Sequence, residues 1–174
     1  LCGRACALPF VRQPVTTNPI LAAAIRAAAQ HHREPLAIDE LILRLATGLL
    51  VADPGGPRPL PLRRPDLAAL ARARRLLDAE TTRVVHAWEL EAVTGLTRYE
   101  LARQIRAAVG TSPYRYSLMR RLASARAQIA RRRPLVEVAL ETGFADQAHF
   151  TRRFTAAFGI TPGQYRALTA QERW

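Results

Sequence analysis

The stretch GFADQAHFTRRFTAAFGITPGQY, residues 143–165, decides the fold of this chain. Asp146 suits the N-cap of a helix, because its carboxylate can accept hydrogen bonds from free backbone N–H groups. Aromatic residues then recur every four positions, which places them on one helix face that should be buried. These residues are Phe150, Phe154 and Phe158. The stretch therefore predicts an amphipathic helix with its polar side chains on the opposite face.

Both ends of this helix carry their own signals. Gly159 stands where a left-handed residue ends a helix, and Pro162 suits the first turn of the next one. Upstream, PLVEVALETG predicts a short helix that ends at Gly143 and is followed by a three-residue turn. A short helix, a tight turn and a second helix are typical of a helix-turn-helix motif, whose second helix enters a DNA major groove.

The same pattern occurs earlier in the chain, in GLTRYELARQIRAAVGTSPYRY, residues 95–116. It aligns with the first stretch at an offset of 49 residues when the turn is allowed one residue of slack. Thr97 stands at the position of Asp146, and Glu100 three residues later completes a capping box. The remaining matches are Leu101, Ile105 and Val109 with the phenylalanines, Arg103 with Arg152, Gly110 with Gly159, Pro113 with Pro162, and Tyr116 with Tyr165. Two copies of one motif indicate an all-α fold with a duplicated DNA-binding unit.

Charge separates the two halves of the 174-residue chain. The net charge is +12, and all 26 basic residues are arginine. Residues 1–96 hold 12 arginines against 9 acids, a net charge of +3, whereas residues 97–174 hold 14 against 5, a net charge of +9. A basic half built from helix-turn-helix motifs favours duplex DNA as the partner.

Other classes of protein find less support in the sequence. No apolar run approaches the roughly 20 residues that span a membrane. We expect a cytoplasmic protein that is associated with the nucleoid. We also expect no cofactor. Cys2 and Cys6 form only half of a zinc site, and His31 and His32 are too distant in sequence to complete it. We expect reduced cysteines, no metal and no enzymatic activity, since no catalytic constellation occurs.

The N-terminal part predicts a helical hairpin. One Ala-rich helix begins at Asn18-Pro19 with its apolar face on Leu21, Ile25 and Ala28, and a second runs from about 38 to 52. The second helix carries an apolar stripe that needs a partner. This partner could be an upstream domain, a second subunit in a homodimer formed through residues 19–52, or both; alternatively, the hairpin docks on the C-terminal domain. This stripe comprises Leu41, Leu45 and Leu49. Residues 53–65, rich in proline and glycine, predict a linker between this region, 1–52, and a DNA-binding domain over 66–174.

Helices are also predicted before and between the two motifs. Residues 66–80 form the first, with Leu67, Leu70, Ala71 and Leu77 turned inward, and the first motif follows over about 84–109. A longer helix over 112–132 joins it to the second motif, over about 135–158. Twenty helical residues span about 30 Å, close to the roughly 34 Å between successive major-groove faces. One chain could therefore place both reading helices in adjacent grooves.

Residues 66–171 resemble the DNA-binding domain of AraC/XylS-type transcription regulators. ETGFADQAHFTRRFTAAFGITPGQYR resembles the C-terminal signature of that family, and residues 95–129 resemble its first motif and linker helix. The resemblance implies seven helices, binding to asymmetric promoter DNA, contact with RNA polymerase and, usually, activation. It also implies that residues 1–52 are the tail of an effector and dimerisation region, so that a small-molecule effector would bind further upstream.

The motif match assigns DNA contacts to individual residues. Arg can bond to guanine and Gln to adenine, while Ala and Thr methyls can meet a thymine methyl. The base-facing candidates are Arg98, Tyr99, Ala102 and Arg103 in the first reading helix, and Gln147, Ala148, Thr151, Arg152 and, at the margin, His149 in the second. The phosphate candidates are Arg106, Arg115, Arg120, Arg121 and Arg153.

The first motif departs from the family pattern at two positions. Glu91 stands where a small Ala is usual between the two helices of the motif, and Ile105 replaces a usual Phe. A carboxylate at that contact has to reach solvent or pair with a nearby arginine such as Arg103. We therefore expect the first motif to be packed less tightly than the second.

Three alternative functions remain open from the sequence. A nonspecific architectural DNA-binding protein would share the charge and the motifs, but not the preference of about 10³-fold or more for one site. A methyl-phosphotriester repair protein resembles the family in this region but needs a four-cysteine zinc site. A protein-interaction module would use the hairpin and bind no DNA even at low salt.

Overall fold

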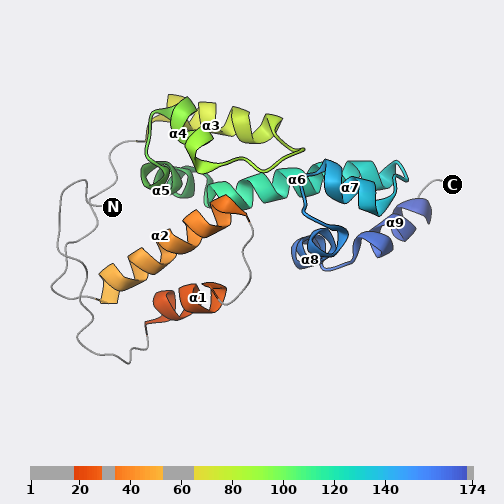
Figure 1. The fold of residues 1–174 in the computed structure, drawn as a ribbon, viewed down its shortest axis with the longest axis horizontal. Helices are drawn as coiled ribbons and strands as arrows, with labels where there is room; N and C mark the ends of the chain where they lie inside the picture. Colours follow the sequence, from red (N-terminus) through yellow and green to blue (C-terminus); the bar gives the residue numbers. More distant parts are fainter. Residues whose placement is uncertain (1–17, 29–33, 53–64, 172–174) are drawn as a thin grey trace. The chain divides into compact units, whose positions relative to one another are not determined.

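A computed structural model describes residues 18–28, 34–52 and 65–171, and every regular element in these ranges is an α-helix (Figure 1). The elements are α1 (Pro19–Ala28), α2 (Pro35–Ala52), α3 (Leu67–Ala79), α4 (Ala87–Thr94), α5 (Arg98–Val109), α6 (Pro113–Ala130), α7 (Leu135–Glu141), α8 (Gln147–Phe158) and α9 (Pro162–Gln171). The predicted all-α class is confirmed. Predictions for Cys2, Cys6, His31, His32 and most of the linker lie outside the described residues.

The described chain divides into two compact units. The first unit joins the described residues up to Ala73 with His86–Tyr114, and the second joins Arg74–Val85 with the described residues from Arg115 onward. The hairpin of α1 and α2 thus belongs to the same unit as the first helix-turn-helix motif, α4 and α5. The boundaries predicted for the domains and the linker stay predictions.

Both helices of the hairpin begin with proline at the first helical position, where its missing N–H costs nothing. Asn18 caps α1, its Oδ1 accepting from the backbone N–H of Ile20 at 3.0 Å and of Leu21 at 3.1 Å. Leu21 packs directly on Gly48 of α2, where an added Cβ would lie 3.0 Å from the Leu21 Cα. Ile25, predicted to face inward, is 56% exposed, because the close approach of α2 selects Leu21 and Ala24 instead.

The start predicted for α2 was three residues too late. The sequence predicts that this helix begins at about residue 38, but Pro35 is its first residue. Proline needs no N–H partner there, since the first turn of a helix leaves its N–H groups unpaired. The stripe of Leu41, Leu45 and Leu49 is partly buried.

The core of the first unit is narrower than the sequence predicts. Leu101 and Ile105 of α5 are buried as expected, but Val109 is 51% exposed because it ends the helix beside Gly110. The inward face of α3 is also misplaced: Leu67 is 73% exposed and Ala71 is exposed as well. Ala69 and Ala73 are buried instead, while Leu77, in the part of α3 that belongs to the second unit, is buried as predicted.

The second unit has an aromatic core that confirms the periodicity of the sequence. Phe150 and Phe154 are completely buried, and Phe158 is partly buried and packs against them. Successive rings along α8 meet edge to face, at centroid distances of 5.5 and 4.6 Å. Such pairs stabilise a core beyond the area they bury. The apolar face of α6 closes this core with Leu122, Ala125 and Ile129, all fully buried.

Arg121 corrects the prediction of a phosphate contact. Its side chain is completely buried in the second unit. Its Nε donates to the carbonyl of Thr142 at 2.8 Å, and Nη2 donates to the carbonyl of Gly143 at 2.6 Å. The guanidinium also lies 4.3 Å from the centre of the Phe144 ring. Arg121 therefore holds the turn between α7 and α8 and is not available to DNA.

Gly143 makes that turn possible. Its φ of +75° lies in the left-handed region, which side chains rarely adopt. A Cβ at this position would also lie 3.0 Å from the Cα of Arg83. The turn between the two helices of the second motif therefore requires glycine for its conformation and for its packing.

Replacing Arg121 should lower stability far more than replacing its neighbour. Arg121→Met fills a similar space but leaves the carbonyls of Thr142 and Gly143 without donors, so we expect a loss of about 2–4 kcal/mol in the free energy of unfolding. Arg120→Met is the control: Arg120 is about half exposed and pairs with Asp78 at 2.8 Å, which contributes less than about 1 kcal/mol. Urea unfolding measures both, and equal losses would contradict the buried role of Arg121.

Candidate nucleic-acid interface

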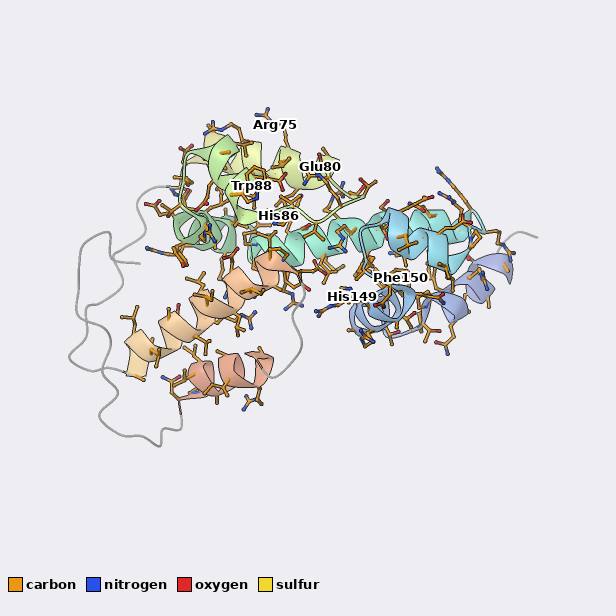
Figure 2. The ribbon with its side chains drawn as sticks, in the orientation of Figure 1. Arg75, Glu80, His86, Trp88, His149 and Phe150 are labelled. Carbon is orange, nitrogen blue, oxygen red and sulfur yellow. The ribbon has the colours of Figure 1, made fainter. Side chains whose placement is uncertain are left out.

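The second reading helix, α8, is built so that its polar side is outside. The Asp146 carboxylate accepts from the backbone N–H of His149 at 2.6 Å and fixes the start of the helix as predicted. Phe150, labelled in Figure 2, turns into the core with Phe154, and this fixes the rotation of the helix. The opposite side carries four of the predicted base contacts: Gln147, Ala148 and Arg152 are exposed, and Thr151 is partly exposed.

His149 is placed differently from the prediction. It is only 8% exposed, and its ring meets that of Phe144 edge to face at a centroid distance of 5.5 Å. Its Nε2 accepts from the Nε of Arg153 at 3.3 Å. His149 lies one position before Phe150, close enough to the apolar stripe to be drawn into the core. It therefore supports α8 from within rather than facing a base.

The first reading helix, α5, starts with the predicted capping box. The Thr97 hydroxyl accepts from the Glu100 N–H at 3.3 Å, and the Glu100 carboxylate accepts from the Thr97 N–H at 3.1 Å. Gly110 ends the helix at a φ of +76°. The buried side of α5 consists of Leu101, Gln104 and Ile105. Gln104 accepts from the backbone N–H of Asp66 at 2.8 Å, which ties α5 to the start of α3.

Three of the predicted DNA contacts share the other side of α5. Tyr99, Ala102 and Arg106 are spaced at i, i+3 and i+7, so they lie in one row along the helix. All three line a single cleft together with Arg98. The structure therefore groups these four side chains, as a reading surface requires. Arg103 lies one position beyond Ala102 and is partly exposed.

Glu91 of α4 pairs with Arg98, not with the predicted Arg103. Its Oε1 accepts from the Arg98 backbone N–H at 2.8 Å, and Oε2 lies 3.3 Å from Nη2 of the same residue. The backbone hydrogen bond is the largest cause of the lowered pKa of Glu91, followed by the side-chain hydrogen bond. The carboxylate thus sits at the positive end of α5, where a negative charge is favourable. The departure from the family pattern joins the two helices of the motif.

The reading side of α5 faces α2 within the same unit (Figure 1). Asp39 Oδ1 lies 3.0 Å from Nη1 of Arg98, and Glu40 Oε1 lies 3.5 Å from Nη2 of Arg106. Glu40 also accepts a hydrogen bond from the Ser112 hydroxyl at 2.6 Å. Hydrogen bonds to Glu91 and then to Asp39 raise the pKa of Arg98. Two arginines predicted to contact DNA are therefore held by carboxylates of α2.

The remaining phosphate candidates are in varied environments. Arg115 is exposed. Arg120 pairs with Asp78, which also accepts from the Tyr116 hydroxyl at 2.8 Å. Burial, and then the hydrogen bond to Asp78, raise the pKa of Tyr116. Their contacts with phosphate stay predictions.

Sequence reasoning overlooked Asp39 and Glu40. They are the only acids in α2, and they are adjacent in a helix whose only other charged residue is Arg44. An isolated pair of acids ahead of a strongly basic segment could have indicated ion pairs. The arginines that pair with these two acids, however, lie 59 and 66 residues away in the chain. Only the fold shows that they meet.

Within 18–28, 34–52 and 65–171, no group of three or more His, Cys, Asp or Glu side chains could hold a metal ion. None of the helices in those ranges is long and apolar enough to cross a membrane.

Several known proteins are similar in sequence to part of this chain. A family model described as a helix-turn-helix domain matches residues 90–168. The chain is 32% identical over 90 residues to the RCS-specific HTH-type transcriptional activator RclR of Escherichia coli, covering 49% of the chain and 32% of RclR. It is also 32% identical over 90 residues to the HTH-type transcriptional regulator MtrA of Neisseria gonorrhoeae, covering 49% of the chain and 30% of MtrA. Both are named as regulators of transcription rather than as enzymes, and the chain spans about a third of their length.

Solved structures agree with this family match. An AraC-type transcriptional regulator from Chromobacterium violaceum is 29% identical, with a TM-score of 0.57 over 61% of this chain and 96% of that one. The DNA-binding domain of AdpA, solved in complex with a target DNA, is 22% identical, with a TM-score of 0.57 over 60% of this chain and 96% of that one. At that identity the second likeness shows the fold alone.

The pairing of Glu91 with Arg98 predicts a pH-dependent contribution to stability. The pKa of Glu91 is lowered in the folded state from an ordinary value of 4.5, so its contribution is present above pH 4.5 and is lost as the pH falls through the folded pKa. Glu91→Gln keeps an acceptor for the Arg98 N–H but loses the charge. We expect wild type to exceed the variant by about 1 kcal/mol in unfolding free energy at pH 7.

Thermal and urea unfolding between pH 3 and pH 7, about the range over which carboxylates titrate, measure this difference. The gap should close in acid and should shrink without disappearing in an Arg98→Met background, which loses the guanidinium but keeps the backbone N–H that is the largest cause of the lowered pKa of Glu91. A gap that does not change with pH would show that the charge of Glu91 contributes nothing.

Proposed function

We propose that this chain is a sequence-specific DNA-binding regulator of transcription, and an activator, because residues 90–168 match a model of a helix-turn-helix domain and the fold is similar to that of an AraC-type regulator. The observation that carries the proposal is the surface of α8. Its rotation is fixed by two buried phenylalanines, and Gln147, Ala148 and Arg152 are left exposed on a capped, rigid helix. These side chains suit the donor, acceptor and methyl pattern of the major groove.

Two reading helices in one chain support binding to an asymmetric site. Both α5 and α8 have 12 residues, a capped N-terminus and a left-handed glycine at the C-terminus. The connecting helix α6 has 18 residues and is about 27 Å long, near the roughly 34 Å repeat of B-DNA. We propose that α5 and α8 enter adjacent major grooves, as two helix-turn-helix motifs of one domain would.

The basic surface supplies affinity rather than selection. Arg106, Arg115, Arg120 and Arg153 are the proposed phosphate contacts, and Arg121 is excluded from this set because it is buried. Each phosphate that is neutralised releases counterions, so binding should weaken steeply as salt increases. AdpA, which shares the fold, is described in complex with a target DNA; binding of this chain to duplex DNA is our proposal.

The partners of the whole protein belong to the proposal. RNA polymerase is the proposed partner on promoter DNA, because one relative is named as a transcriptional activator. A homodimer would form through residues 19–52, with Leu41, Leu45 and Leu49 at its centre. A small-molecule effector would bind a domain upstream of these residues, and the location would be cytoplasmic, on the nucleoid.

Arg152→Ala tests base reading by α8. Arg152 should contact a base rather than a phosphate, so its loss should weaken binding to a selected duplex by about tenfold or more and binding to random duplexes by much less. Arg115→Ala is the matched control, because an exposed arginine that contacts phosphate should weaken both by a similar factor. Fluorescence anisotropy at fixed salt measures the four affinities.

Two outcomes would change the proposed function. Equal losses for Arg152→Ala on both duplexes would reassign Arg152 to a phosphate. Equal affinity of the wild type for selected and random duplexes would indicate a nonspecific architectural protein instead.

A further inference from the structure

We infer that α2 is an intramolecular competitor of DNA: it covers the reading side of α5 and has to leave before that helix can enter a major groove. The inference rests on the proposed function, since it assigns to α5 the DNA-reading role that α2 would block. It concerns the first unit alone, in which α2, α4 and α5 pack together.

The acidic side chains of α2 pair with arginines of α5 that we propose to contact DNA. Arg98 and Arg106 lie eight residues apart on α5, about 12 Å along the helix. Consecutive carboxylates of α2 hold them, Asp39 at 3.0 Å and Glu40 at 3.5 Å. The guanidinium groups that would meet phosphate or guanine oxygens therefore meet carboxylate oxygens instead. A carboxylate and a phosphate satisfy the same guanidinium fork, so the two partners exclude each other.

Besides these two ion pairs, α2 makes an apolar contact with α5. Leu36 is 6% exposed and, with Leu43, lines the cleft that also contains Tyr99 and Ala102. Tyr99 and Ala102 are the proposed base contacts in the middle of the reading row. The cover is therefore steric as well as electrostatic: the side chains that would reach the base edges face α2.

Ser112 gives the contact a third anchor. This residue is 3% exposed, and its hydroxyl donates to Glu40 at 2.6 Å. It precedes Pro113, the first residue of α6. Glu40 thus joins α2 both to α5 and to the junction between α5 and α6. A carboxylate held by a buried hydroxyl is more precisely placed than one held by exposed arginines alone.

The second reading helix has a different environment. Gln147, Ala148 and Arg152 of α8 are exposed on their own unit. A chain with α2 in place would therefore read DNA through α8 alone, and release of α2 would add α5. Because α2 and DNA compete for α5, the apparent affinity for a site that needs both helices equals the intrinsic affinity multiplied by the fraction of molecules in which α5 is free.

The charge test uses the full chain with Asp39→Asn and Glu40→Gln combined. The matched control combines Glu137→Gln and Glu141→Gln, which changes the net charge equally and removes the pairing of these two α7 acids with Arg133, which precedes α7. If α2 occupies α5 in nine molecules out of ten, the first pair should raise affinity for a selected duplex about tenfold. The control pair should raise it less than about twofold. Equal effects of the two pairs would overturn the inference.

A second variant removes contact without changing charge. Leu36→Ala should also tighten DNA binding several-fold, because it weakens the seat of α2 in the cleft. A supporting role for α2 makes the opposite prediction: Leu36→Ala would lower the melting temperature of the first unit and leave DNA affinity unchanged or weaker. That result would overturn the inference even if the charge variants had tightened binding.

Hydrogen exchange follows the movement directly. On addition of the selected duplex to wild type, amides of α2 should lose protection while amides of α5 gain it. Increased protection of α2 on DNA would show that α2 is part of the bound state and would contradict competition. If neither wild type nor any variant binds duplex DNA at low salt, the proposed function itself fails; if all bind with equal affinity, only the role of α2 fails.

Discussion

In both helix-turn-helix motifs, burial of one helix face decides which side chains remain to meet DNA. Phe150 and Phe154 fix the rotation of α8, and Leu101 and Ile105 fix that of α5. A helix that is apolar on one side can be packed in only one rotation, so its opposite side is determined at the same time. The caps at Asp146 and Thr97 then fix where each helix begins. The set of side chains that we propose to meet DNA is therefore determined by this rotation.

The turn of the second motif shows how much support such a rotation needs. Arg121 spans from α6 to the carbonyls of Thr142 and Gly143, and Gly143 lies against the backbone of Arg83. An arginine buried under aromatic rings serves structure, although its charge suggests contact with a phosphate. The first motif uses another solution, in which Glu91 bonds to the start of α5 through Arg98. The contacts of Arg121 lie away from the proposed DNA surface, whereas Glu91 also pairs with the side chain of Arg98, a proposed base contact. Both sets of contacts position a reading helix.

Periodic and local signals predicted most of the fold. The four-residue spacing of phenylalanines, the capping residues and the terminal glycines are local patterns, and the helices they predict agree with the structure to within about three residues at each end. Long-range pairing was not predictable. Arg121 lies between other arginines and has no sequence feature that separates a buried guanidinium from an exposed one. Asp39 and Glu40 contact Arg98 and Arg106 only because α2 packs against α5. The exposure of Leu67 likewise depends on which elements pack against α3.

Selection of bound sequences from a random duplex pool, with the full chain at moderate salt, tests the central claim most directly. Two short enriched blocks about 10 base pairs apart would show that both reading helices select bases along one face of DNA. The competition by α2 predicts that the block read by α5 is weak in the wild type and strengthens when Asp39 and Glu40 are neutralised. Binding without enrichment of any sequence would contradict the account, because side chains fixed on α8 would then read nothing.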